Sequence, residues 1–195
     1  AVNFPPSFTS ILASTPSGKR AATTLVSRDY NRNLVLLKVN TTEQYTTASP
    51  VPHAEVIVGQ WAVALGKTYS REVVNQSLGI VSATNRIWGK AIQTDAKISP
   101  ANYGGPLIDI QGRVYGILTP LSPHGQSPTD GTDWYDSGIG FAVPLIDILP
   151  HLDTLKAGKD LHSGLLGVSL KSGDIYDLPA EIVAVQPKSP ARTGG

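Results

Sequence analysis

The sequence predicts an all-β protein with many short strands, and three observations support this fold class. Among its 195 residues are 19 Gly and 15 Pro, more than a helical protein usually carries. Short runs rich in Val, Ile, Leu and Thr recur along the chain and are separated by turn residues. Apolar residues follow a helical period in only one convincing stretch. Together these features are typical of a β-sandwich or β-barrel.

The expected strands fill most of the first three quarters of the chain. Each is a run of apolar or β-branched residues bounded by turn-forming residues. Residues 41–52 are polar and contain Pro, which predicts a link between two halves of a β-structure. Residues 121–137 predict a long loop, and loops of that length in compact domains are usually functional or mobile. The expected strands are residues 8–12, 20–27, 34–40, 61–66, 73–83, 91–94, 113–119 and 138–143.

A short helix is expected after the last of these strands. Pro144 suits its first turn, because the N–H that Pro lacks would have no partner inside the helix there. Pro150 should kink or shorten the helix, and Gly158 is a plausible end. The residues that recur at helical spacing are Leu145, Ile148, Leu149, Leu152 and Leu155.

The remaining residues predict a second, incomplete unit. Residues 156–163 are polar and Gly-containing and predict a linker, after which a β pattern starts again at residues 165–170 and 181–185. We therefore expect one domain over residues 1–158, and a linker with the beginning of another domain over residues 159–195.

Composition and charge narrow the possible partners. The net charge of +1 comes from 16 basic and 15 acidic residues without blocks, so no nucleic-acid partner is expected. No apolar run approaches the ~20 residues that span a bilayer. The absence of Cys excludes disulfides and zinc–thiolate sites, and no His pair has ligand spacing, so neither a metal nor a cofactor is expected. The chain starts with Ala and contains no Met or visible signal peptide, which predicts a processed form or an excerpt.

Several motifs in one order resemble the protease domain of the HtrA/Deg family of serine peptidases. The central motif is AIQTDAKISPANYGGPL at residues 91–107, followed by GRVYGILT at 112–119 and GFAVPL at 140–145. Upstream, VGQWAVALGK and SLGIVSATNR at residues 58–67 and 77–86 are also similar. The resemblance implies a chymotrypsin/trypsin-like double β-barrel with a short C-terminal helix. The first barrel is expected to lack its opening strands, because little precedes residue 8.

The same resemblance implies that the catalytic residues are replaced. Tyr103 stands where the family has its nucleophilic Ser, and Ala101 where a Gly precedes it in the oxyanion turn, with Asn102 and Gly104 on either side of Tyr103. The stretch NRNLVLLKV puts Asn33 at the position of the catalytic Asp. The catalytic His would fall at or just before Ala1. No intact catalytic residue is therefore expected.

The C-terminal segment resembles the beginning of a PDZ domain. Leu165, Leu166, Gly167 and Val168 fall on the loop that offers backbone N–H groups to a peptide carboxylate in that family. The pattern SPARTGG at residues 189–195 is a further PDZ-like feature. The resemblance therefore implies a truncated peptide-binding segment.

Three functions remain open from the sequence. The first is a catalytically inactive serine-protease homologue that binds proteins or peptides, with a homo-oligomer or a completing chain as the expected assembly. The second is an active HtrA-like endopeptidase whose site is atypical or completed from outside the chain. The third is a ligand- or metal-binding module on the same scaffold, with the loop 121–137 as its site. The resemblance suggests an extracytoplasmic location such as the periplasm or cell envelope.

Individual His and Trp residues have competing interpretations. His124, with the three Asp residues of the long loop, predicts either a metal or proton site or a solvated polar loop. Trp61 opens an apolar strand and is expected in the core. Trp88 and Trp134 are either exposed recognition residues or half-buried loop anchors.

Overall fold

The computed structural model describes residues 1–2, 10–15, 17–67, 73–121, 137–171 and 181–194. The chain divides into two compact units, Ala1–Leu161 and His162–Gly195, which are described separately. The domain boundary expected after residue 158 stays a prediction. No helix in the described ranges has the length and apolar character needed to cross a bilayer.

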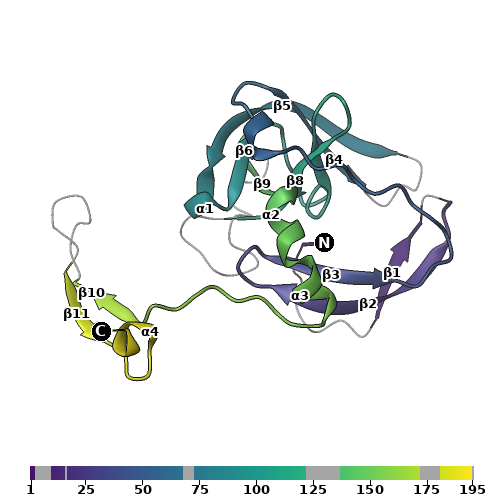
Figure 1. The fold of residues 1–195 in the computed structure, drawn as a ribbon. Helices are drawn as coiled ribbons and strands as arrows, with labels where there is room; N and C mark the ends of the chain where they lie inside the picture. The colour runs from purple at the N-terminus through teal and green to yellow at the C-terminus, as the bar shows by residue number, and fades with distance from the viewer. Residues whose placement is uncertain (3–9, 16, 68–72, 122–136, 172–180, 195) are drawn as a thin grey trace. The chain divides into compact units, whose positions relative to one another are not determined.

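A closed six-stranded antiparallel barrel forms the centre of the first unit (Figure 1). Its strands pair in the order β4-β5-β6-β9-β8-β7, and β4 closes the barrel by pairing with β7. Five of the six strands were expected from the sequence, whereas the three-residue β7 was missed. The strands are β4 (Trp61–Lys67), β5 (Val74–Asn85), β6 (Ala91–Thr94), β7 (Pro106–Ile108), β8 (Val114–Leu118) and β9 (Gly140–Pro144).

The inside of this barrel is packed with small and aliphatic side chains. In β4 the two-residue period points Ala62 and Ala64 inward, where both are fully buried. Trp61 therefore points outward and is 55% exposed, so the prediction that Trp61 lies in the core is wrong. The strand begins at the expected residue, but small residues fill its inner face. Val81, Leu107 and Leu118 complete the centre of the core with no exposed surface.

A three-stranded antiparallel sheet precedes the barrel, with strand order β1-β2-β3. Its strands are β1 (Ile11–Ser14), β2 (Arg20–Asp29) and β3 (Leu34–Val39). Val2 forms an isolated antiparallel bridge with Leu34 at the start of β3. Within the described ranges this sheet is not closed into a barrel, and the expectation that the first barrel lacks its opening strands stays a prediction.

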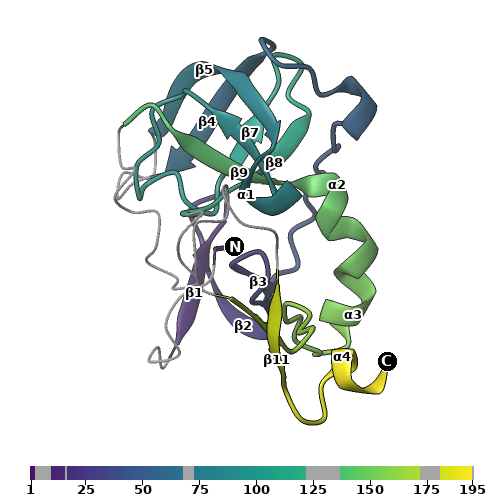
Figure 2. The same ribbon diagram turned by 90° about the vertical axis from the view of Figure 1, so that its left-hand side faces the viewer.

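The expected helix is present but segmented. It consists of α2 (Leu145–Ile148), the 3-10 turn η3 (Leu149–His151) and α3 (Leu152–Lys156), so the interruption falls at Pro150, as predicted. Gly158 ends the run with φ of 76°, a left-handed conformation that Gly adopts without steric cost. Figures 1 and 2 show the run leaving the barrel at β9 and passing beside the three-stranded sheet. The Ser27 hydroxyl of β2 donates a hydrogen bond of 2.9 Å to the Leu155 carbonyl, which fixes the helix there.

The second unit contains a two-stranded sheet and one helical turn. These are β10 (Val168–Leu170), β11 (Ile182–Val185) and α4 (Pro190–Thr193). Ser189 caps α4 by accepting a hydrogen bond of 3.3 Å from the Arg192 backbone N–H. The expected loop at Leu165, Leu166, Gly167 and Val168 lies just before and at the start of β10. Its peptide-binding role remains a prediction.

Candidate functional site

The turn between β6 and β7 holds the residues expected at the centre of the site. Asn102 organises this turn and is only 4% exposed. Its side-chain oxygen accepts hydrogen bonds from the backbone N–H of Ser99 at 3.0 Å and from the Ser99 hydroxyl at 3.1 Å. The backbone N–H of Asn102 donates to the Ser99 carbonyl at 2.8 Å. Because these bonds close the turn on itself, Asn102 has a structural role here.

Tyr103 follows Asn102 and is half-buried against the barrel core. Its ring lines a cavity together with Ile98, Thr119 and Phe141. The cavity left beside the ring has a volume of about 10 Å³, no more than a single water needs. Burial raises the pKa of the Tyr103 phenol above its usual range, because the low-dielectric surroundings disfavour the phenolate. The ring therefore fills this part of the site and stays protonated at neutral pH.

The two backbone N–H groups of an oxyanion hole are engaged elsewhere in this turn. In serine peptidases these donors belong to the nucleophile and to the residue two positions before it, which are Tyr103 and Ala101 here. The Ala101 N–H donates to the Ser99 hydroxyl at 3.3 Å, and the Tyr103 N–H donates to the Pro100 carbonyl at 3.3 Å. Ala101 also keeps its φ out of the left-handed region, which its Cβ disfavours. Both N–H groups thus donate to other atoms of the same turn.

Gly104 joins the turn to the rest of the site. Its φ of 82° needs a Gly, and its N–H donates to the Leu118 carbonyl at 2.8 Å. A Cβ at Gly104 would lie 3.3 Å from the backbone N of Val2. The chain start therefore lies directly beside the turn that carries Tyr103.

Asn33 lies in the turn between β2 and β3, next to the same chain start. Its φ of 57° is left-handed, which Asn tolerates better than most residues. Two residues later, the Val35 N–H donates to the Ala1 carbonyl at 2.8 Å. The fold thus brings together three sequence-predicted places: the chain start where a His was expected, the turn of Asn33, and the turn of Tyr103.

Asp29, four residues before Asn33, stabilises that turn. It is 1% exposed and accepts hydrogen bonds from Arg32, one from the backbone N–H at 3.1 Å and one from Nη1 at 3.0 Å. Its carboxylate is thus already neutralised by a local cation. In this structure Asp29 holds the turn together through Arg32.

The His and Trp candidates are placed elsewhere or lie outside the described residues. His53 pairs with Asp147, and His151 approaches Arg32 Nη2 at 3.2 Å. Trp88 is 83% exposed, which confirms the exposed alternative. His124, Trp134 and the acidic residues of the long loop lie outside the described residues. Elsewhere in the described chain, no group of three or more His, Asp or Glu side chains is placed to hold a metal.

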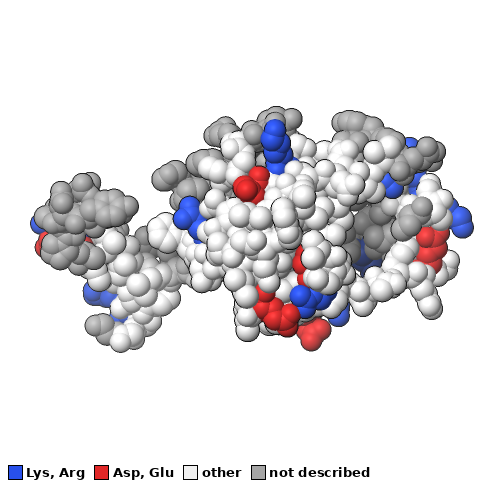
Figure 3. All heavy atoms as spheres, turned by 90° about the horizontal axis from the view of Figure 1, so that it is seen from above, with Lys and Arg blue, Asp and Glu red and all other residues white. Residues whose placement is uncertain are grey.

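Sequence reasoning missed one pairing at the edge of a pocket. His53 Nε2 and Asp147 Oδ1 lie 2.6 Å apart at the edge of a pocket in the barrel unit. The strands of the barrel lie between the two residues in the sequence, and no motif links them. Only the folded arrangement could have revealed them. Charged side chains are otherwise scattered, and the face seen in Figure 3 carries no block of one sign.

A closed β-barrel whose β6–β7 turn carries NYGGPL defines the scaffold class of the trypsin-like serine peptidases. The chain belongs to that family: the trypsin-like peptidase domain matches residues 4–117. Its relatives identify it further as an HtrA-type domain, as the motif resemblance implied.

Two curated relatives show how far the similarity extends. A probable periplasmic serine endoprotease, DegP-like, of Rickettsia prowazekii (strain Madrid E) is 31% identical over 83% of this chain and 30% of its own length. The serine protease Do-like HtrA of Lactococcus lactis subsp. cremoris is 28% identical over 91% of this chain and 49% of its own length. The chain therefore spans a third to a half of these relatives.

A solved structure shares the fold. The HtrA-type protease AlgW with decapeptide superimposes with a TM-score of 0.75 at 25% sequence identity, over 97% of this chain and 60% of the AlgW chain. The all-β, trypsin-like fold predicted from the sequence is confirmed by this match. The PDZ-like interpretation of the C-terminal segment stays a prediction.

Proposed function

We propose that this domain is a catalytically inactive serine-protease homologue that binds proteins or peptides. The observation that carries the proposal is the β6–β7 turn. Tyr103 replaces the Ser nucleophile, and the two N–H groups that would form the oxyanion hole donate to Ser99 and Pro100 instead. Acyl transfer needs an activated nucleophile and donors aimed at the developing oxyanion. The turn offers neither.

Activation of Tyr103 as an alternative nucleophile would need a base and an acid to orient that base. The family resemblance puts the His at or just before Ala1, and Asn33 stands at the position of the acid. Burial, which raises the pKa of Tyr103, makes its deprotonation harder still. The balance of these effects favours a packing role for the Tyr103 ring.

Polypeptides are the partner class that the scaffold favours. The curated relatives are endoproteases, whose substrates are polypeptides, and the AlgW structure contains a decapeptide. A scaffold that loses catalysis can keep such binding, because binding and chemistry depend on different groups. The relatives described as periplasmic also support an extracytoplasmic location for this protein. A second chain that completes the open three-stranded sheet, another copy or a different one, stays a prediction.

Covalent labelling with a fluorophosphonate tests the proposal. The protein with its native flanking sequence is incubated with the reagent, trypsin serves as the positive control, and mass spectrometry locates any adduct. We expect trypsin to be labelled and this chain to remain unmodified. An adduct on any residue of the 99–105 turn would overturn the proposal. It would favour instead an endopeptidase with an atypical or externally completed site.

A further inference from the structure

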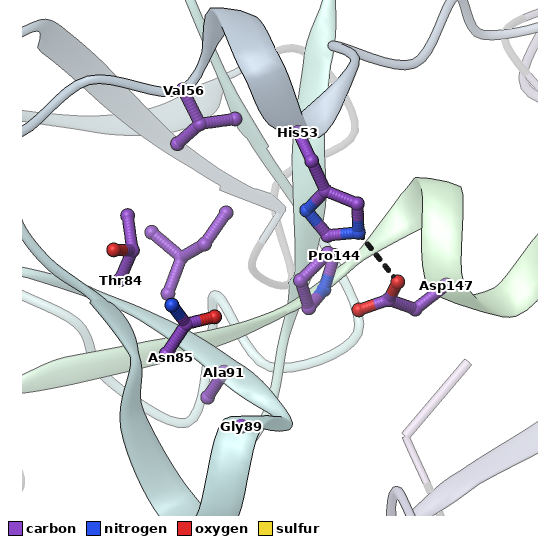
Figure 4. A pocket seen from close by; sticks show the side chains of 9 residues that line it. His53, Val56, Thr84, Asn85, Gly89, Ala91, Pro144 and Asp147 are labelled. Carbon is purple, nitrogen blue, oxygen red and sulfur yellow. Dashed lines mark hydrogen bonds and ion pairs between the residues drawn. The ribbon is translucent and has the colours of Figure 1, made fainter.

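A pocket on the barrel unit is built from three segments that are distant in sequence. Its volume is about 320 Å³, within the range of small-ligand sites. It lies between the 3-10 turn η1 (His53–Glu55), the connection from β5 to β6, and the start of α2. Figure 4 shows side chains from all three segments around the same space.

Polar groups stand on opposite walls of this pocket. On one wall, His53 Nε2 and Asp147 Oδ1 are 2.6 Å apart, and the dashed line in Figure 4 marks this pair. On the other wall are Thr84, whose hydroxyl both donates and accepts, and Asn85, whose amide does the same. Val56 and Pro144 provide apolar surface between the walls. No Lys or Arg is among the lining residues.

The wall that carries Asn85 continues into an unusual short helix, α1 (Arg86–Gly89). Asn85, Ile87 and Trp88 have φ values of 56°, 52° and 59°, all in the left-handed region. For a β-branched residue such as Ile87 this conformation is a steric outlier. It persists only where the surrounding structure enforces it, and such strain concentrates at binding and catalytic sites.

The strained turn presents a large aromatic side chain to solvent. Trp88 is 83% exposed and directly precedes Gly89, which lines the pocket. Packing does not explain this arrangement, because a Trp held for stability would be buried. An exposed aromatic beside a polar pocket is a common element of recognition surfaces.

We propose that this pocket binds an uncharged amide group presented by a polypeptide, such as a Gln or Asn side chain. The proposal rests on the proposed function only in taking a polypeptide as the partner. The Asp147 carboxylate accepts the amide N–H, while Thr84 and Asn85 donate to the amide carbonyl from the opposite wall. Trp88 packs on the apolar part of the segment.

An amide fits this pocket better than a charged side chain does. His53 Nε2 already contacts Asp147 Oδ1 at 2.6 Å, so the second carboxylate oxygen is the acceptor that the pocket offers, and one amide N–H is enough to satisfy it. The absence of Lys and Arg from its walls leaves no partner for an anion. An amide carries one donor group and one acceptor group side by side, which matches the acceptor wall and the donor wall.

Nuclear magnetic resonance of the ¹⁵N-labelled protein tests this site with a defined probe. Acetyl-Ala-Gln-Ala-N-methylamide is titrated to tens of millimolar, and acetyl-Ala-Leu-Ala-N-methylamide, which has no primary amide, and maltose are titrated separately. We expect the Gln peptide to shift the backbone amides of Thr84, Asn85 and Ala91 with saturation. Asp147→Asn is expected to weaken this binding about tenfold. Asp153→Ala, which changes a fully exposed carboxylate in the same helical run, is the matched control and should leave it unchanged.

Three outcomes would overturn the proposal. They are the absence of shifts at these amides, equal shifts with the Leu peptide, and saturable binding of maltose in place of the peptide. If Asp147→Asn fails to fold, His53→Gln and Trp88→Ala provide independent variants, and unchanged binding in both would count against the site. Cleavage of the peptide in the same tube would appear as new peptide signals. It would contradict the proposed function without affecting the location of binding.

Discussion

Replacing Tyr103 with Ala removes the side chain that fills the degenerate nucleophile position. A Tyr side chain buries roughly 200 Å² when fully enclosed, so this half-buried ring accounts for about 100 Å². At about 25 cal/mol per Å² the loss is ~2.5 kcal/mol. The space left behind opens toward solvent and adds little cavity cost, so we expect a decrease of ~2–3 kcal/mol in the free energy of unfolding.

Urea unfolding followed by Trp fluorescence measures this loss. All three Trp residues lie in the first unit, so the signal reports on the unit that contains Tyr103. Tyr45→Ala is the matched control, because Tyr45 is 48% exposed and its replacement should cost less than about 1 kcal/mol. A loss below about 0.5 kcal/mol for Tyr103→Ala, typical of surface substitutions, would refute the packing role of the ring.

Two further predictions concern the same turn. Gly66→Ala would place a Cβ against the Ala101 carbonyl and 2.8 Å from the Asn102 Cα, so the backbone must shift. We therefore expect the free energy of unfolding, measured with urea, to fall by ~1–3 kcal/mol. Asp153→Ala, which changes a fully exposed side chain of the same unit, should be close to neutral, and equal effects of the two variants would contradict the described packing.

At alkaline pH, the raised pKa of Tyr103 should make stability depend on its proton. The native state favours the neutral phenol, so its contribution is full below the ordinary Tyr value of about 10 and is lost as pH rises through the higher native value. The unfolding free energy of the wild type should therefore fall relative to Tyr103→Phe above that pH. A constant difference between the two proteins would show that Tyr103 is not buried.

Much of the barrel could be predicted from the sequence, because its strands are separate apolar runs with turn residues between them. β7 (Pro106–Ile108) was missed, since three residues are too few to show a two-residue period. Trp61 was misplaced because aromatic character suggests burial, whereas the alternation in β4 puts the small Ala62 inside. In both cases the closure of the barrel determines the result: it sets where β7 pairs and which face of β4 points inward, and the local residue pattern does not show either.

The sequence motif located the candidate site, but the positions of its side chains and backbone N–H groups depend on the fold. The motif NYGGPL at residues 102–107 aligns Tyr103 with the nucleophile position but does not show where the Tyr103 ring packs. The engagement of the Ala101 and Tyr103 N–H groups by Ser99 and Pro100 is a property of backbone geometry, which no residue pattern reveals. The closeness of Asn33 to the chain start similarly depends on the pairing of Val2 with Leu34.

Cleavage of unfolded casein by the protein with its native flanking sequence is the most direct measurement of the central claim. The site geometry predicts no cleavage above that of a buffer control, and no difference between the wild type and Tyr103→Phe. Cleavage by the wild type that disappears in Tyr103→Phe would show that the phenol is a working nucleophile. That result would contradict the assignment of this domain as an inactive homologue.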